Sequence, residues 1–415
     1  MSPVIKRRSS CRLCGMRKFD RVVSLKPSPL ANSFLDKNKI AEEEISYALD
    51  LYFCCNCNHV QLLDVVDPGL LFNNYVYVSG TSSQFVKHFE SYANTVISKY
   101  EVPEGSFVLE IGSNDGTFLR KFIERKMEVL GVDPAKDIAL NATKNGVNTW
   151  PRFFSQELAA EIYNKIGVPR IIAANNVFAH CDNLSEIIEG VKTLMDRDSI
   201  LIFEVSYLLD VYQKTLFDTI YHEHLDYHAV RPLKSFFDNH GMKLIDVERV
   251  ASHGGSIRCA VQLSDGNCKI SDTVDKLCSL EIEMGLDTQD PFIEFVSRID
   301  SIGRRLKELL LGIREDGKKI VGFGAPAKST TLLNHYGIGG DILDYIVDDN
   351  KLKQGLYTPG GHIPILPTEK IYETPPDYLL ILAWNFYKSI VATHASYFNQ
   401  GGRFIVPLPE PMIVQ

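Results

Sequence analysis

Short apolar runs alternate with longer amphipathic stretches through the middle of the chain. From about residue 67 the pattern is helical. Four short runs then have the character of strands buried on both faces, namely residues 107–111, 128–132, 170–174 and 199–205. Strands separated by helical stretches predict a parallel sheet. Two later runs, residues 243–249 and 256–263, indicate an antiparallel finish to that sheet.

A second strand-turn-helix pattern follows a charged helical connector. Within residues 271–316, apolar side chains recur at helical spacing and predict a pair of connecting helices; they include Ile299, Ile302, Leu306 and Leu310. The strand 319–324 then enters a glycine-rich turn, and the strand 345–347 ends at an acidic stretch, Asp348-Asp349-Asn350. This pattern predicts a nucleotide-type α/β domain at the C-terminal end of the chain.

The N-terminal segment is irregular and carries two CxxC pairs, Cys11 with Cys14 and Cys54 with Cys57. Two thiolates from each pair close a tetrahedral site and leave no position open for water, so the spacing predicts a structural zinc ion. The alternative is two incidental pairs of core cysteines. Cys55 lies between ligands and is interpreted as a neighbour only.

The domains expected from these patterns are a zinc-binding domain at 1–66, an α/β domain with a parallel sheet at 67–285 and a Rossmann-like domain at 286–415. The length of 415 residues fits two or three domains. The net charge of −8 argues against a protein that coats nucleic acid, since the longest basic run is Lys6-Arg7-Arg8.

No apolar run approaches the roughly 20 residues that cross a bilayer, and the start of the sequence lacks the apolar core of a signal peptide. We therefore expect a cytoplasmic protein with a small-molecule substrate and neither a membrane nor a nucleic-acid partner. The sequence does not decide between a monomer and a homodimer.

The turn after the first predicted strand reads Glu110-Ile-Gly112-Ser-Asn114-Asp-Gly116. Its glycines let the backbone approach a ligand closely. Carboxylates at this turn repel a pyrophosphate but attract the sulfonium and amino groups of S-adenosylmethionine. Asp133, at the end of the next predicted strand, is placed to accept hydrogen bonds from ribose hydroxyls. These residues predict a binding site for S-adenosylmethionine in the domain at 67–285. They resemble the ExGxGxG motif and acidic strand end of class I methyltransferases, with Asn114 in place of the central glycine.

A nicotinamide fingerprint in this turn requires glycine or alanine at Asn114 and Thr117, and neither is present. The string Ala174-Asn175-Asn176-Val-Phe-Ala-His180 follows the next strand, where the methyltransferase fold commonly lines the methionine part of the donor. Asn175 is therefore a further cofactor candidate. The alternative is an ordinary glycine turn in another α/β enzyme.

The segment Tyr221-His222-Glu223-His224 places four titratable or hydrogen-bonding groups in succession, just beyond the fourth of the predicted strands named above. This density is typical of acid–base chemistry. A metal site is the alternative, but His-Glu-His lacks the i, i+4 spacing of the HExxH motif.

Together these strings resemble the family of sugar C-methyltransferases that act on nucleotide-linked 4-keto-6-deoxy sugars. The resemblance covers nearly the whole chain and rests on the CxxC pairs and on the strings at 75–79, 110–116, 175–180, 221–224, 253–258 (HGGSIR) and 322–330 (GFGAPAKST). It implies an N-terminal zinc domain, a class I methyltransferase Rossmann-like sheet and a second Rossmann-like domain. The implied reaction is methylation of a sugar ring carbon, usually carbon 3, beside the 4-keto group.

A carbon nucleophile attacks the donor methyl only after losing a proton, and the adjacent ketone stores the resulting charge as an enolate. We expect His224 to be the base, with Glu223 supporting it. Tyr221 and His180 are the candidate donors to the enolate oxygen. The resemblance also brings Tyr77 into the pocket, although a tyrosine at that position is otherwise a core residue.

The C-terminal turn Gly322-Phe-Gly324-Ala-Pro-Ala327 fits the relaxed dinucleotide pattern GxGxxA. We assign it to the nucleotide half of the substrate, whose diphosphate would meet Lys328 and Ser329 at the start of a helix. The alternative is a vestigial turn whose glycines only permit tight packing. His222 is a further candidate for substrate binding.

Two other functions compete with sugar methylation: a zinc-ribbon methyltransferase that acts on nucleic acid, and an NAD-dependent sugar-nucleotide oxidoreductase. The acidic net charge disfavours an enzyme that acts on nucleic acid. An oxidoreductase would need the C-terminal turn as its cofactor site and would leave the Glu110 turn with a purely structural role, which inverts the stronger evidence. The nucleobase, the stereochemistry of the sugar and the methylated carbon are left open by the sequence.

Overall fold

The computed structural model describes residues 5–72, 80 and 83–414. The chain packs into two compact units, each built from separate stretches of sequence. Unit 1 comprises Met1–Asp20, Phe53–Leu209 and Leu225–Thr288, and unit 2 comprises Arg21–Tyr52, Asp210–His224 and Gln289–Gln415. The division into domains at 1–66, 67–285 and 286–415 stays a prediction.

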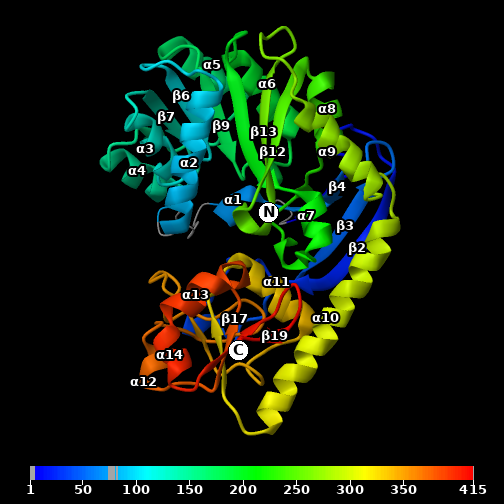
Figure 1. The fold of residues 1–415 in the computed structure, drawn as a ribbon, viewed down its shortest axis with the longest axis vertical. Coiled ribbons are helices and arrows are strands. Elements are labelled where there is room, and N and C mark those ends of the chain that lie inside the picture. Colours follow the sequence, from blue (N-terminus) through cyan, green and yellow to red (C-terminus); the bar gives the residue numbers. More distant parts are fainter. Residues whose placement is uncertain (1–4, 73–79, 81–82, 415) are drawn as a thin grey trace. The chain divides into compact units, whose positions relative to one another are not determined.

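Unit 1 is built on a seven-stranded sheet (Figure 1) in the order β12-β13-β10-β9-β6-β7-β8. All neighbouring pairs are parallel except those of β13, which runs antiparallel to both β10 and β12. The strands are β6 (Phe107–Ile111), β7 (Glu128–Val132), β8 (Thr149–Trp150), β9 (Ile171–Asn175), β10 (Ile200–Ser206), β12 (Met242–Val250) and β13 (Ser256–Leu263). The expected parallel sheet with an antiparallel finish is therefore confirmed.

Alternate strand residues face opposite layers of this unit, as the pleat requires. On one side Val108, Ile171 and Ile202 share a core with side chains of α2 (Ser83–Lys99) and α3 (Thr117–Ile123). On the other side the Phe203 ring packs at a tilt against Phe178 and against Phe237 of α8 (Val230–Asn239), with ring centroids 4.6 and 5.8 Å away. Both faces are covered, which explains why the strands are apolar throughout.

Unit 1 contains further helices besides α2 and α3. They are α1 (Pro68–Phe72), α4 (Lys136–Lys144), α5 (Gln156–Lys165), α6 (Leu184–Leu194), α8 (Val230–Asn239) and α9 (Asp272–Glu283). Near the N-terminus β1 (Ile5–Arg7) pairs with β5 (Asp64–Val66), and β4 (Val60–Leu62) pairs with β11 (Asp226–Tyr227). These short ladders join the cysteine-bearing segment to residues 225–227.

Unit 2 is built on a six-stranded sheet in the order β16-β15-β14-β17-β18-β19, which is parallel except for β19. Its strands are β14 (Ile320–Phe323), β15 (Ile346–Val347), β16 (Ile365–Leu366), β17 (Tyr378–Ile381), β18 (Arg403–Val406) and β19 (Met412–Ile413). Its helices are α7 (Leu208–Gln213) in part, α10 (Asp290–Glu315), α11 (Ala327–Tyr336), α12 (Lys370–Glu373), α13 (Tyr387–Thr393) and α14 (Ala395–Asn399). The second Rossmann-like fold is therefore present.

Two further features complete the fold. The expected pair of connecting helices is present as α9 and α10. Strands β2 (Phe19–Ser28) and β3 (Tyr47–Cys54) are neighbours in a sheet and enclose a short 3₁₀ turn at Lys37–Lys39. Among the described residues, no helix is long and apolar enough to cross a membrane.

Candidate functional site

The four cysteines of the two CxxC pairs converge in unit 1, with their sulfur atoms all within 4.8 Å of one another. Cys11 Sγ lies 3.6 Å from Cys57 Sγ, and Cys14 Sγ lies 3.6 Å from Cys54 Sγ. A tetrahedral zinc ion with Zn–S bonds of about 2.3 Å separates its sulfurs by about 3.8 Å, so the cluster fits that ion. The thiol of Cys55 instead donates to Asp20 Oδ2 at 3.0 Å, as expected of a neighbour.

The donor turn lies at the carboxyl ends of β6 and β7. Gly112 and Gly116 have φ of 70° and 75°, in the left-handed region. A Cβ at Gly112 would stand 2.5 Å from the Val177 side chain, and one at Gly116 would stand 2.7 Å from Val147. Both positions therefore require glycine for conformation and for space.

Asn114 occupies the central position of this turn, where the resemblance has glycine. Its φ is 50°, and asparagine is one of the few side chains that adopt this region readily. Its backbone N–H donates to Asp133 Oδ2 at 2.8 Å, and Ala135 N–H donates to Asp133 Oδ1 at 2.9 Å. The departure from glycine is thus compatible with the turn, which also fixes the Asp133 carboxylate.

Glu110 and Asn175 meet at the ends of neighbouring strands, where Asn175 Nδ2 donates to Glu110 Oε1 at 3.2 Å. Within the described residues, the buried Glu110 Oε2 and Asn175 Oδ1 have no hydrogen-bond partner. Burial raises the pKa of Glu110 well above its usual value, while the Asn175 hydrogen bond lowers it. Acceptors held in this way fit the cationic sulfonium and amino groups of S-adenosylmethionine.

His180 ends a 3₁₀ turn, Phe178–His180, that follows β9 and is tied to residue 225 because Leu225 N–H donates to the Ala179 carbonyl at 2.6 Å. The structure therefore brings His180 into the same unit as the donor turn. Tyr77 lies outside the described residues, so its expected place in the pocket stays a prediction.

A buried ionic network at the end of β10 was missed by sequence reasoning. Glu204, only 2% exposed, accepts hydrogen bonds from both His88 of α2 and Arg258 of β13. Burial by itself would raise its pKa, but the His88 bond and the Arg258 charge together lower it. Arg258 also lies 3.6 Å from the centre of the Tyr92 ring. Arg258 belongs to the string HGGSIR, and that string was the sequence feature that could have indicated this network.

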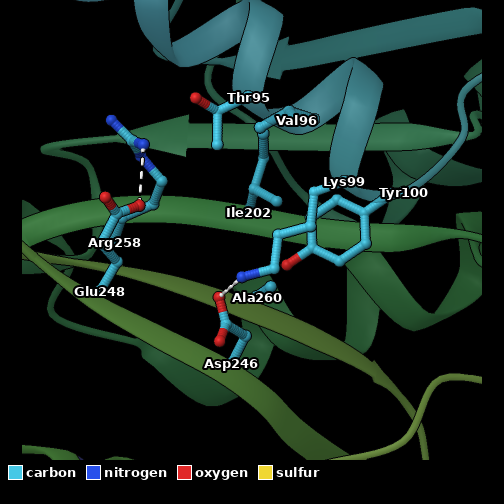
Figure 2. Close-up of a pocket in the computed structure, with 9 residues that line it drawn as sticks. All are labelled: Thr95, Val96, Lys99, Tyr100, Ile202, Asp246, Glu248, Arg258 and Ala260. Atoms are coloured by element: carbon cyan, nitrogen blue, oxygen red, sulfur yellow. Dashed lines mark hydrogen bonds and ion pairs between the residues drawn. The ribbon is translucent and has the colours of Figure 1, made fainter. Parts of the chain in front are cut away.

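Figure 2 shows a pocket between α2 and the sheet of unit 1, crossed by hydrogen bonds from Lys99 to Asp246 and from Arg258 to Glu248. None of the predicted donor-site residues lines it. Its lining residues are Thr95, Val96, Lys99, Tyr100, Ile202, Asp246, Glu248, Arg258 and Ala260. The charges in it are already paired with one another, so the pocket offers no free charge for the donor.

The acid–base segment 221–224 belongs to unit 2. His224 Nδ1 lies 2.8 Å from the carbonyl oxygen of Thr219, and His224 Nε2 lies 2.7 Å from the Tyr221 hydroxyl. A carbonyl oxygen can only accept, so Nδ1 carries the hydrogen. In the neutral ring the lone pair is then on Nε2, to which the Tyr221 hydroxyl donates. This tautomer makes Nε2 the atom that can take a proton.

Glu223 is 3% exposed and accepts a hydrogen bond of 2.6 Å from Asn32 Nδ2. Burial raises the pKa of Glu223 to about 7, and the Asn32 amide partly offsets this effect. Asn32 is 191 residues away in sequence, so no local pattern could have indicated it.

His222 is 1% exposed, its Nε2 donates to the Ala48 carbonyl at 3.3 Å, and its ring meets Tyr47 edge-on. These contacts with β3 hold the ring in the interior of unit 2. Its assignment to substrate binding stays a prediction.

Lys328 and Ser329 lie in the first turn of α11, where the sequence predicts them. Ser329 is 4% exposed, and its hydroxyl donates to the Pro326 carbonyl at 2.7 Å. The Lys328 ammonium donates to Asn385 Oδ1 at 2.7 Å and lies 4.2 Å from the centre of the Trp384 ring. Both polar groups thus have partners within unit 2.

The acidic turn at the head of a seven-stranded sheet with one antiparallel strand defines a class I methyltransferase. Three family descriptions match successive parts of the chain: a zinc binding domain at residues 11–72, a methyltransferase domain at 90–247 and a C-methyltransferase C-terminal domain at 251–409.

The curated protein C-methyltransferase NovU of Streptomyces niveus is 33% identical over 414 residues, which is 100% of this chain and 99% of that protein. The chain belongs to this family of C-methyltransferases. It is an enzyme that uses S-adenosylmethionine, and it carries a structural zinc site at the four cysteines.

Two solved structures resemble this chain over less than half of its length. The magnesium protoporphyrin IX methyltransferase of Synechocystis PCC 6803, with bound S-adenosylmethionine, is 13% identical over 48% of this chain and 99% of that one, with a TM-score of 0.36. The PH0226 protein of Pyrococcus horikoshii OT3 is 12% identical over 47% of this chain and 98% of that one, with a TM-score of 0.35.

Proposed function

We propose that this C-methyltransferase acts on a nucleotide-linked 4-keto-6-deoxy sugar and methylates the ring carbon beside the ketone, carbon 3, through an enolate. The observation that carries the proposal is the tautomer of His224, whose Nδ1 is held by the Thr219 carbonyl so that Nε2 is basic. A carbon beside a ketone needs such a base before it can become a nucleophile.

In the proposed reaction His224 Nε2 takes the proton from carbon 3, and the electron pair moves into the enolate. The Thr219 carbonyl then stabilises the imidazolium through the bond to Nδ1. Tyr221, released from Nε2, turns its hydroxyl to the enolate oxygen, with His180 as the second donor. S-adenosylmethionine supplies an electrophilic methyl group when bound. Carbon 3 would form the new bond to that methyl as the methyl–sulfur bond breaks, with the electron pair of that bond leaving on sulfur in S-adenosylhomocysteine, and the ketone would be restored.

The donor turn serves this reaction by holding charge. Glu110 and Asn175 would face the amino and sulfonium groups, which replace the missing partners of Glu110 Oε2 and Asn175 Oδ1. Asp133 would take the ribose hydroxyls on the lone pairs that its two backbone hydrogen bonds leave over. The turn between Gly112 and Gly116 would let the backbone close on the ligand.

The proposal assigns the nucleotide half of the substrate to the C-terminal domain. The turn at Gly322–Ala327 supports it, because Gly324 has a φ of 82° and a Cβ there would stand 3.0 Å from Ala383. Such a backbone can approach a diphosphate closely. The methyl-donor domain and the zinc-binding domain complete the proposed three-domain division.

The test incubates the purified enzyme and S-adenosylmethionine with a panel of nucleotide-linked sugars that differ in the 4-keto group, and follows each by mass spectrometry. Methylation of keto sugars alone is expected, and methylation of a sugar without the ketone would refute the enolate. In deuterium oxide, His224→Asn should lose both methyl transfer and exchange at carbon 3.

His240→Asn is the matched control, because His240, which directly follows α8, makes the same kind of bond from Nδ1 to the Phe236 carbonyl, at 2.8 Å. It should retain both activities. Exchange that persists in His224→Asn would move the base to another group, with Tyr221 and His222 next to be tested.

A further inference from the structure

Helix α11 begins with polar side chains that are buried. Ser329, Thr330 and Thr331 are 4%, 4% and 2% exposed, and the Lys328 side chain is 13% exposed. A helix start that binds a phosphate group usually points its polar groups at the ligand. The polar groups of α11 instead have partners inside unit 2, so the role of the string GFGAPAKST has to be sought there.

Lys328 faces a buried carboxylate. Its Nζ lies 3.9 Å from Asp218 Oδ2, which also accepts a hydrogen bond of 2.6 Å from the Trp384 indole. Asp218 is 0% exposed, and among the described residues its Oδ1 has no hydrogen-bond partner. Burial raises the pKa of Asp218, and the Lys328 charge opposes that effect. A buried carboxylate of this kind depends on its cation, which fixes where residue 218 lies.

Thr331 holds the same stretch of chain two residues further on. Its hydroxyl donates to the Ile220 carbonyl at 2.7 Å. Positions three apart in a helix share one face, so Lys328 and Thr331 act from the same side of α11. They contact Asp218 and Ile220, which flank the Thr219 carbonyl on either side.

The Thr219 carbonyl is the acceptor for His224 Nδ1. Residues 217–219 form a 3₁₀ turn, and the orientation of that carbonyl depends on how the turn is held. A carbonyl that rotated away would remove the preference for hydrogen on Nδ1, and part of the His224 population would then carry hydrogen on Nε2. That tautomer cannot accept a proton at Nε2.

We propose that Lys328 and Thr331 are positioning residues for the methyl transfer, because they clamp the peptide 218–220 and thereby set the tautomer of His224. The inference rests on the proposed function, which makes His224 the base. It also gives Lys328 a role other than the diphosphate ligand that the sequence predicts.

Thr331 offers the cleaner test, since valine removes only the hydroxyl while serine keeps it. Thr331→Val should lower kcat roughly 10-fold, a part of the 10²- to 10⁴-fold that a placed base supplies. The KM values for sugar nucleotide and S-adenosylmethionine should stay at the wild-type value. Thr331→Ser should restore kcat.

Tyr336→Phe is the matched control. It deletes a buried hydroxyl of the same helix, which donates to the Ile299 carbonyl at 3.0 Å and is not bonded to residues 218–220. Wild-type kcat in Tyr336→Phe, together with a lowered kcat in Thr331→Val, would show that the effect comes from the bond to Ile220. A general loss of packing in α11 would lower kcat in both variants. Equal kcat in the two variants would overturn the proposal.

Lys328→Met gives the second test, with Lys328→Met/Asp218→Asn as the charge-balanced form. A fall in kcat with KM unchanged is expected for both. A raised KM for the sugar nucleotide with kcat retained would overturn the proposal and restore Lys328 as a diphosphate ligand.

Nitrogen-15 NMR of histidine-labelled protein reads the tautomer directly, with the His224 signals identified by their loss in His224→Asn. Wild type should show hydrogen on Nδ1, and Thr331→Val should show a mixture. An unchanged tautomer in Thr331→Val overturns the clamp. A fully active His224→Asn enzyme would instead overturn the proposed base. The NMR result would then still decide whether Thr331 sets the tautomer of His224.

Discussion

The buried carboxylate of Glu223 makes the stability of the enzyme depend on pH in a direction that can be worked out. Its pKa rises from the usual 4.5 to about 7 in the folded chain. A raised pKa means that the folded state favours the neutral acid. The stabilising contribution is therefore complete below about pH 4.5 and is lost as the pH rises through about 7.

The size of the effect follows from the same two values. Each tenfold change in proton affinity is worth about 1.4 kcal/mol, so a change from 4.5 to about 7 corresponds to about 3 kcal/mol. Glu223→Gln cannot ionise and lacks this dependence. The free energy of unfolding of the variant, relative to wild type, should rise by about 3 kcal/mol between pH 4.5 and pH 8.

The assay is denaturation by urea, followed by the fluorescence of Trp384 in unit 2. The chain has two tryptophans, so a Trp150→Phe background leaves Trp384 as the reporter. Other groups titrate equally in both proteins and cancel in the difference. Glu308→Gln, at an exposed position of α10, is the control and should follow wild type at every pH. Parallel curves for Glu223→Gln and wild type would refute the reasoning.

The remaining predictions concern the metal and the donor. Removal of zinc by a chelator should unfold the N-terminal segment, and metal analysis should give one zinc per chain, retained in Cys55→Ser but lost in Cys14→Ser. Calorimetry should show binding of S-adenosylmethionine and none of NAD, and Asp133→Asn should weaken donor binding about 10-fold, the loss of roughly one charged hydrogen bond. Asn114→Gly should bind the donor like wild type, whereas Asn114→Val, at a φ of 50°, should bind about 10-fold more weakly because a branched side chain costs roughly 1–2 kcal/mol there. Wild-type affinity in Asn114→Val would contradict the importance of that backbone conformation.

The sheet of unit 1 could be predicted well because its strands are buried on both faces. The runs 107–111, 128–132 and 256–263 match β6, β7 and β13 residue for residue. The run 170–174 is displaced by one residue from β9, because polar Asn175 pairs with Glu204 at the end of the ladder. Hydrophobic pattern does not mark such a residue, and pairing with a neighbouring strand decides it.

The surroundings of the acid–base segment could not be predicted. The Tyr221–His224 string was visible as a cluster of reactive groups, but its partners come from distant parts of the chain. The Asn32 amide bonds to Glu223, and the Thr331 hydroxyl bonds to Ile220, just before the string. Such partners depend on tertiary packing, which leaves no local period in the sequence. Asn114 shows the opposite case, since a residue that departs from the family pattern has a backbone conformation that asparagine tolerates.

The cysteine cluster also constrains the segment of chain that lies between its two CxxC pairs. Cys14 and Cys54 are 40 positions apart and meet at 3.6 Å, so the metal ties off the intervening segment as a closed loop. Closing a loop of that length costs an unlinked chain on the order of 3 kcal/mol of conformational entropy. Asn32 sits within the loop, so one ion restricts the freedom of the segment that delivers the hydrogen bond to Glu223. Zinc would thus restrain a residue that is not one of its ligands, and loss of the metal should raise the pKa of Glu223 further.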